Sequence, residues 1–384
     1  MREVDFQHVP AVARRIERDE LAKRISELEA DLATERANSA DLAEQLGSAR
    51  EELESLRREQ TERATELDTA AAQSALFSAE IATCRSLAEK CVFIVGFGRS
   101  KTTITLELLN CASNALILSE ANFFLDDHGE KFSTWYNNQH RDFGNQRTKS
   151  SHAPAFLPDE PHTWWQWLAS AAQFYDCIGD KIAFSDYHLG KAPPDTFRPF
   201  YEARFLKSRY IFLLRNPVDV LLSGAKLMSI VDDVGMNRLC AAWLDFMELW
   251  ADFVRVFPLT LTIICERFGE GTVEQLEAFT GLDLGDARLL ISPANTRQHK
   301  LTGKFPTLAR VKVQLEELYA EAVAAADENH VLWQAEQKRN ASANDSRGEE
   351  LGWIAMTSHP IGRLWLRVQE VRERLGLSPM DGAK

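Results

Sequence analysis

The 384-residue sequence lacks several features that define other classes of protein. No apolar run approaches the roughly 20 residues of a membrane-spanning helix, and the N-terminus has no apolar core of the kind found in secretory signals. The six cysteines include no C-x-x-C pair, so we expect reduced, mostly buried thiols and a cytoplasmic location. The net charge of −13 argues against a nucleic-acid partner, which needs a basic face.

Residues 11–75 lack proline and aromatic residues, contain a single glycine, and carry dense charge of both signs. Leucine and other apolar residues recur here at heptad spacing from position 21 to position 70, and eleven of the fifteen seam positions are apolar. The four polar seam residues are Glu35, Ser39, Gln60 and Arg63. The pattern predicts an N-terminal coiled coil that makes the protein a homo-oligomer, and a solvated helix folded back on the rest of the chain is the alternative.

From residue 91 the pattern changes to alternating strands and helices, which predicts a mainly parallel sheet covered on both faces. We expect strands near 92–97, 181–188, 209–214 and 259–268, and a short strand within 115–124 that ends in a polar turn before Glu120. Later helices are expected near 236–256, 307–340 and 359–375. A further helix contains Trp164, Trp165 and Trp167. Tryptophans so close together on a helix are more typical of a core than of a sugar-stacking surface.

Two segments carry the chemistry: residues 92–105 read VFIVGFGRSKTTIT and residues 209–223 read RYIFLLRNPVDVLLS. Each begins as an apolar run typical of a buried strand, breaks into a polar turn, and continues as an amphipathic helix. Free backbone N–H groups and the helix dipole at such a turn favour an anion. Two such sites on one sheet predict a ligand with phosphates at both ends.

This pair of motifs resembles the nucleotide-binding signature of sulfotransferases that use 3′-phosphoadenylyl sulfate (PAPS). Their first loop commonly reads (R/K)-S-G-T-T, where this chain has RSKTT at 99–103, and their second motif is R-(D/N)-P with a serine eight residues after the arginine, where this chain has Arg215 and Ser223. The resemblance covers about residues 91–305. It implies a P-loop-like three-layer α/β domain over 88–384, with a C-terminal helical extension over 306–384. It also implies sulfation of a carbohydrate or glycolipid hydroxyl, as in bacterial relatives, without a metal.

The resemblance assigns roles to individual residues. The first loop would hold the 5′-phosphate and the bridging oxygen through Gly98, Arg99, Ser100, Lys101, Thr102 and Thr103. Arg99 and Lys101 would also assist the departing phosphate, and Arg215 with Ser223 would bind the 3′-phosphate. Lys101 stands where the family usually has glycine. Either this position has positive φ and strains the lysine, or the turn is helical and the lysine adds a phosphate-binding cation; we favour the second interpretation.

The catalytic base has two candidates, each by comparison with a branch of the family. Glu120 follows the second expected strand, where a carboxylate faces the cleft of an open α/β sheet. His188 follows the third expected strand, two residues after Asp186. Glu120 is the first choice, with a helix-capping carboxylate and a buried imidazole as the structural alternatives. Lys181, in a G-D-K segment, either contacts substrate or extends to water.

Two other functions compete with an active sulfotransferase. A P-loop kinase or NTPase needs G-x-x-x-x-G-K-[ST], but Val95 and Ser100 occupy the two glycine positions before Lys101. A non-catalytic scaffold, with a silent sulfotransferase-like domain on a coiled coil, is compatible with the heptads and with Lys101.

Overall fold

The computed structural model describes residues 9–125, 132, 163–184, 194–291, 304–342 and 360–375. The chain divides into two compact units, residues 1–77 and residues 78–384. Candidate base His188 lies outside the described residues. None of the helices in the described ranges is both long enough and apolar enough to cross a membrane.

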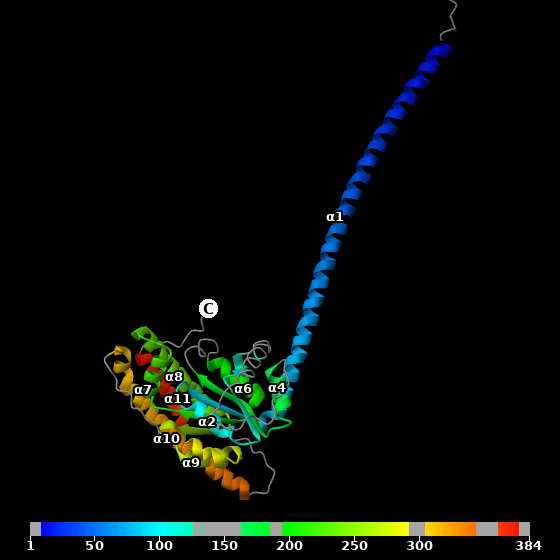
Figure 1. Ribbon diagram of the computed structural model, residues 1–384. Coiled ribbons are helices and arrows are strands. Elements are labelled where there is room, and N and C mark those ends of the chain that lie inside the picture. The colour runs from blue at the N-terminus through cyan, green and yellow to red at the C-terminus, as the bar shows by residue number, and fades with distance from the viewer. Residues whose placement is uncertain are drawn as a thin grey trace, which may run out of the picture. The chain divides into compact units, whose positions relative to one another are not determined.

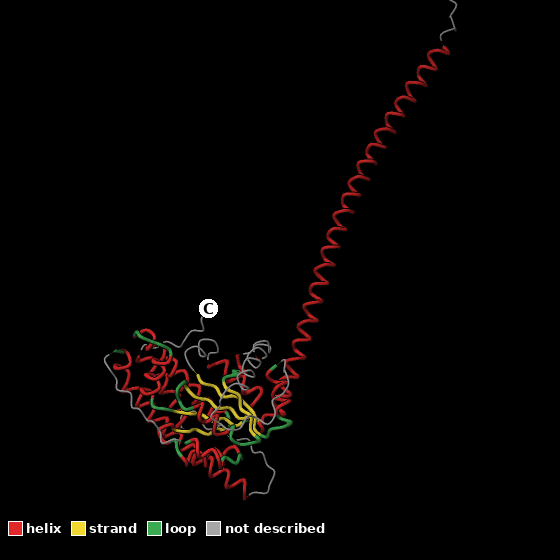
Figure 2. The backbone as a smooth tube through the Cα atoms, in the orientation of Figure 1, coloured by secondary structure: helices red, strands yellow, loops and turns green. Residues whose placement is uncertain are grey.

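The first unit consists of most of helix α1, Val9–Leu87, which Figure 1 and Figure 2 show as one unbroken helix. Its sequence favours a helix because it is rich in alanine, leucine, glutamate and arginine. Ion pairs one turn apart add support, as between Arg63 and Glu59 at 2.6 Å. The helix expected over 11–75 is therefore present, and its pairing with another helix stays a prediction.

The second unit is built on a five-stranded parallel sheet with the order β2-β3-β1-β4-β5. The strands are β1 Cys91–Phe97, β2 Ala115–Ser119, β3 Cys177–Phe184, β4 Arg209–Leu214 and β5 Thr260–Ile264. Nearly every strand residue is buried, as expected when helices cover both faces. From β1 the chain goes to the edge strand β2, returns to β3, and then crosses β1 to reach β4 and β5 on the other side. Strands on the two sides of β1 are thus reached by connections in opposite directions, which makes a topological switch point beside β1.

Helices cover both faces of this sheet (Figure 1). One face packs against α2 Thr102–Leu109 and α9 Glu270–Thr280. The other face packs against α4 Trp164–Ala171, α6 Pro194–Phe205, α7 Pro217–Leu227, α8 Asp233–Val256, α10 Pro306–Ser342 and α11 Pro360–Leu375. Short 3₁₀ helices occur at η2 Ala88–Lys90, η3 Phe123–Leu125, η4 Cys265–Arg267 and η5 Gly285–Leu290. The expected three-layer α/β architecture is confirmed.

β2 ends at Ser119, before the polar turn, as predicted, and Glu120 and Asn122 in that turn both have positive φ (62° and 52°). Two other strand predictions were wrong at one end. β3 begins at Cys177 rather than at residue 181, because its first residues pair with β1 and β2. The strand expected over 259–268 ends at Ile264, where the 3₁₀ helix η4 begins. Trp164 and Trp167 are core residues with 2% and 0% exposure, as the sequence predicts.

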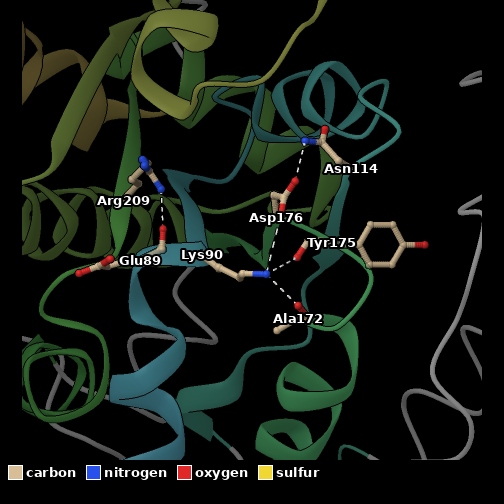
Figure 3. A network of polar contacts seen from close by, with 7 residues as sticks. All are labelled: Glu89, Lys90, Asn114, Ala172, Tyr175, Asp176 and Arg209. Atoms are coloured by element: carbon tan, nitrogen blue, oxygen red, sulfur yellow. Dashed lines mark hydrogen bonds and ion pairs between the residues drawn. The ribbon is translucent and has the colours of Figure 1, made fainter.

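Polar contacts join the segments at the amino-terminal edge of the sheet (Figure 3). Lys90 donates to the carbonyls of Ala172 and Tyr175 at 2.8 and 3.3 Å and lies 3.8 Å from Asp176. Arg209, the first residue of β4, donates to the Glu89 carbonyl at 2.6 Å. These bonds connect the amino-terminal ends of β1, β3 and β4. The register between these strands is therefore fixed, and so are the positions of their carboxyl-terminal ends.

Candidate active site

The loop after β1 turns sharply at two glycines. A Cβ on Gly96 would lie 2.7 Å from Thr102 Cγ2, so only glycine lets α2 begin this close to the strand. The Gly98 N–H donates to the Phe184 carbonyl at 2.6 Å, and the Ser100 N–H donates to the Phe97 carbonyl at 3.1 Å. These bonds fold the loop over the ends of β1 and β3 and direct the N-terminus of α2 at the same edge.

Lys101 occupies the left-handed region with φ 59°, so our interpretation of the turn as helical was wrong. The physical cause is tertiary: its Nζ donates to the Cys265 carbonyl at 2.8 Å and lies 4.8 Å from the ring centroid of Phe268. Partial burial lowers the pKa of Lys101, and Arg215 adds to the effect, whereas Cys265 and Glu266 oppose it. Lys101 thus adopts a left-handed conformation that favours glycine, while its side chain adds a cation to the loop.

The structure brings the two sequence motifs into direct contact. Arg99 Nε donates to Ser223 Oγ at 3.1 Å, and an Arg215 guanidinium N–H donates to the Arg99 carbonyl at 2.7 Å. Arg99 itself has φ 76°, which turns its carbonyl toward Arg215. Throughout the described ranges, no carboxylate forms an ion pair with Arg99, Lys101 or Arg215. This edge of the sheet therefore presents three cations without a direct ion-pair partner, which attract an anion.

The hydroxyl residues of the first motif lie around the start of α2. Ser100 and Thr102 are buried at 1% and 4% exposure, and Thr103 is exposed on the first turn of the helix. Their backbone N–H groups belong to the first turn or precede it, where no carbonyl within the helix accepts them. All predicted loop residues from Gly98 to Thr103 are therefore gathered at one helix N-terminus.

Glu120 lies beside the end of β2 and pairs with the lysine of the G-D-K segment. Lys181 Nζ is 2.5 Å from Glu120 Oε1, and the lysine side chain is 3% exposed whereas the glutamate side chain is 48% exposed. The Glu120 N–H donates to the Lys181 carbonyl at 2.8 Å, so main chain and side chain connect the same two residues. Lys181 thus contacts the candidate base instead of extending to water.

Asp180 holds the Glu120 loop, a role that we did not predict from the sequence. Its fully buried carboxylate accepts the Ala121 and Asn122 N–H groups at 3.0 and 2.7 Å. Burial raises the pKa of Asp180 to about 7, although those two bonds and the charge of Lys181 lower it. The available signal was an acidic residue inside an otherwise apolar strand, since a buried carboxylate needs partners.

Glu266 fixes the turn that carries Arg215. It accepts the Asn216 N–H at 2.9 Å through one oxygen and the Tyr319 hydroxyl through the other. The side chain of Asn216 in turn caps α7 by accepting the Val218 N–H at 3.0 Å. These contacts attach α10 to the ends of β4 and β5. The backbone of the turn that contains Arg215 is therefore held in place by hydrogen bonds.

The site lies within a segment that matches a known family. A family model described as "Sulfotransferase family" matches residues 91–286, just over half of the chain and all of the residues discussed above except Tyr319. The chain belongs to the sulfotransferase family. The match confirms the resemblance drawn from the two motifs.

Solved structures of other sulfotransferases are similar to this one. The sulfotransferase domain of the Synechococcus PCC 7002 olefin synthase shares 16% identity at a TM-score of 0.40, covering 75% of this chain and 94% of that one. A sulfotransferase from Alicyclobacillus acidocaldarius shares 18% identity at a TM-score of 0.36, covering 63% of this chain and 98% of that one. No curated protein matches the sulfotransferase described here.

Proposed function

We propose that this sulfotransferase moves a sulfuryl group from PAPS to an acceptor hydroxyl. The observation that supports the donor is the cluster of Arg99, Lys101 and Arg215, none of which forms an ion pair with a carboxylate of the described residues. A nucleotide with phosphates at the 3′ and 5′ positions supplies complementary charge. The residues fit such a donor, because one cation group adjoins a helix N-terminus and the other follows a neighbouring strand.

The first motif would hold the 5′ side of the donor. The loop N–H groups, together with the hydroxyls of Ser100, Thr102 and Thr103, would donate to the 5′-phosphate, while Arg99 and Lys101 neutralise the charge that develops on it as it leaves. Arg215 and Ser223 would hold the 3′-phosphate. Because Arg99 already donates to Ser223 Oγ, the two phosphate subsites adjoin each other.

Glu120 is the proposed base. Its carboxylate would accept the proton of the acceptor hydroxyl as the acceptor oxygen bonds to sulfur and the sulfur–phosphate oxygen bond breaks. Lys181 Nζ, 2.5 Å away, orients this carboxylate. Asp180 holds the backbone after Glu120 by accepting the N–H groups of Ala121 and Asn122. His188 is retained as the alternative base.

A carbohydrate or glycolipid is the proposed acceptor, and its support is the resemblance to bacterial relatives alone. Trp164 and Trp167 give no further support because both rings are buried, Trp164 being stacked on Phe123 at 5.1 Å between centroids. Transfer from PAPS to a panel of sugars, glycolipids and phenols tests the choice. Sulfation of phenols alone would reject the carbohydrate class.

Calorimetric titration of the full chain tests the donor. We expect tight binding of 3′,5′-diphosphoadenosine, the product of the transfer, and weak binding of ATP with magnesium. The reverse preference would assign the chain to the kinases, and the absence of binding to either nucleotide would leave a non-catalytic scaffold. A 3′-dephosphorylated analogue serves as the control for the adenosine and 5′-phosphate contacts.

A further inference from the structure

Helix α1 exposes an apolar seam along the first unit, interrupted at two places by polar residues. Nine leucine and isoleucine residues at the seam positions are 49–70% exposed: Leu21, Ile25, Leu28, Leu32, Leu42, Leu46, Leu53, Leu56 and Leu67. Removing such side chains from water favours association with a partner. The spacing alternates between four and three residues, which places Leu21 at a d position and Ile25 at an a position of a heptad repeat.

Charges beside the seam identify a partner of the same sequence. In a parallel, in-register pair, each g residue faces the e residue five positions later on the second copy. The three charged pairs formed in this way are Arg24 with Glu29, Asp31 with Arg36, and Glu52 with Arg57. The other g–e pairs each contain an uncharged residue: Asn38 with Ala43, Gln45 with Arg50, Glu59 with Ala64, and Glu66 with Ala71. Every charged pair is attractive, and two-fold symmetry doubles each of them.

An antiparallel pair would place like charges together. In that orientation g residues face g residues and e residues face e residues. Except for Arg24, the g positions are acidic or uncharged, and except for Glu29 the e positions are basic or uncharged. Apart from contacts of Arg24 and Glu29, every contact between two charged residues would therefore join like charges. Like-charge contacts of this kind select against the antiparallel arrangement.

We propose that α1 pairs with α1 of a second copy of this chain in a parallel, in-register, two-stranded coiled coil. Leucine is the most frequent d residue, at Leu21, Leu28, Leu42 and Leu56, and leucine at d is typical of two-stranded coils. The charged d residues Glu35 and Arg63 favour two strands over three, because their long side chains reach water at the open rim of a dimer. The two sulfotransferase units then follow from the same end of the coil.

Disulfide cross-linking of the full chain tests orientation and register. Ser39 and Gln60 occupy a positions, where each residue faces its own copy in the proposed pair. Ser39→Cys alone and Gln60→Cys alone should each form a covalent dimer on mild oxidation, and a mixture should form no 39–60 cross-link. Failure of both variants to self-link would overturn the proposal, because an antiparallel pair places each a position opposite a d position of the second copy. Wild type and a Cys111→Ser background control for the native thiols, of which Cys111 is the least buried.

Light scattering tests the strand number. We expect twice the chain mass of 43.4 kDa; a mass of one or three chains would overturn the proposal. Leu46→Glu with Leu53→Glu should give a monomer. The matched control, Ala37→Glu with Ala72→Glu, adds the same charge at outer f positions and should remain a dimer. Both double variants should bind 3′,5′-diphosphoadenosine as wild type does, so loss of pairing is distinguished from misfolding and from failure of the proposed function.

Discussion

The two ends of the same strands use cations differently. Arg209 begins β4 and donates to the Glu89 carbonyl at 2.6 Å, and Arg215 follows the end of β4 and donates to the Arg99 carbonyl at 2.7 Å. At the amino-terminal edge the neighbouring cations have carboxylate partners, as Lys90 has in Asp176 (Figure 3) and Lys207 has in Glu89. At the carboxyl-terminal edge Arg99 and Arg215 have none in the described ranges.

This difference teaches that hydrogen bonding to carbonyls does not distinguish a structural cation from a binding cation. The charge balance of the surrounding residues distinguishes them. A cation whose charge is neutralised within the fold contributes to stability, whereas a cluster without such neutralisation raises the local concentration of anions. The position agrees with the general rule that open parallel sheets bind ligands at the carboxyl ends of their strands.

The largest effect is expected at Glu120, the exposed carboxylate beside the carboxyl-terminal end of β2. Glu120→Gln should lower kcat roughly 10²–10⁴-fold, because it removes the proposed proton acceptor while conserving shape. Calorimetry should show an unchanged affinity for 3′,5′-diphosphoadenosine. Unchanged turnover would remove Glu120 as the base and make His188 the next variant to test.

Arginine substitutions at the two ends of β4 sharpen the comparison directly. Arg215→Ala should weaken binding of 3′,5′-diphosphoadenosine roughly 10- to 100-fold, since a hydrogen bond to a charged group is worth about 1.5–3 kcal/mol. Binding of the 3′-dephosphorylated analogue should be nearly unchanged. Arg209→Ala, the control at the amino-terminal edge, should change neither affinity. Equal losses for both nucleotides in Arg215→Ala would refute its assignment to the 3′-phosphate.

Much of this edge could be predicted from sequence because its signals are local. Strand, turn and helix follow one another around Arg99 and around Arg215, and parallel pairing of β1 with β4 then brings both turns to one edge. The contact between Arg99 and Ser223 follows from that topology. The coarse order of strands and helices was predictable for the same reason.

Other features depend on contacts that the sequence does not reveal. Asp180 was missed because its partners, Ala121 and Asn122, lie 59 and 58 residues earlier in the chain. The start of β3 was misplaced because its first residues are fixed by pairing with β1 and β2, which lie far away in the sequence. The backbone of Lys101 was misjudged because Cys265, its partner, lies 164 residues away.

Asp180→Asn tests how the Glu120 loop is held. The oxygen of the asparagine amide can accept one of the two N–H groups, but its NH₂ group would face the other. We therefore expect kcat to fall about tenfold, which is equivalent to about 1.4 kcal/mol. The affinity for the nucleotide should be unchanged. Asp176→Asn at the amino-terminal edge should leave kcat unaltered. An unaltered kcat in Asp180→Asn would show that the loop needs no charged acceptor.

The same variant has a pH signature that general loosening of the fold would not produce. Burial raises the pKa of Asp180 from 3.8 to about 7, so the folded state keeps this proton over a range in which the unfolded chain loses it. Its contribution to the free energy of unfolding is therefore present below about pH 4 and is lost as the pH rises through about 7. Denaturation across this range should show that slope in wild type and its loss in Asp180→Asn.

The smallest expected effect comes from substitutions of Lys101, which separate the contribution of its backbone conformation from that of its charge. Lys101→Ala and Lys101→Gly both remove the ammonium group and its bond to Cys265, so both should weaken 3′,5′-diphosphoadenosine binding to the same extent. Only glycine adopts φ 59° without steric cost. The glycine variant should therefore be more stable than the alanine variant by about 1 kcal/mol, measured by urea denaturation. Equal stabilities of the two variants would contradict a left-handed conformation of residue 101 in solution. Tighter nucleotide binding by the glycine variant than by the alanine variant would show that backbone strain, and not charge alone, limits phosphate binding by this loop.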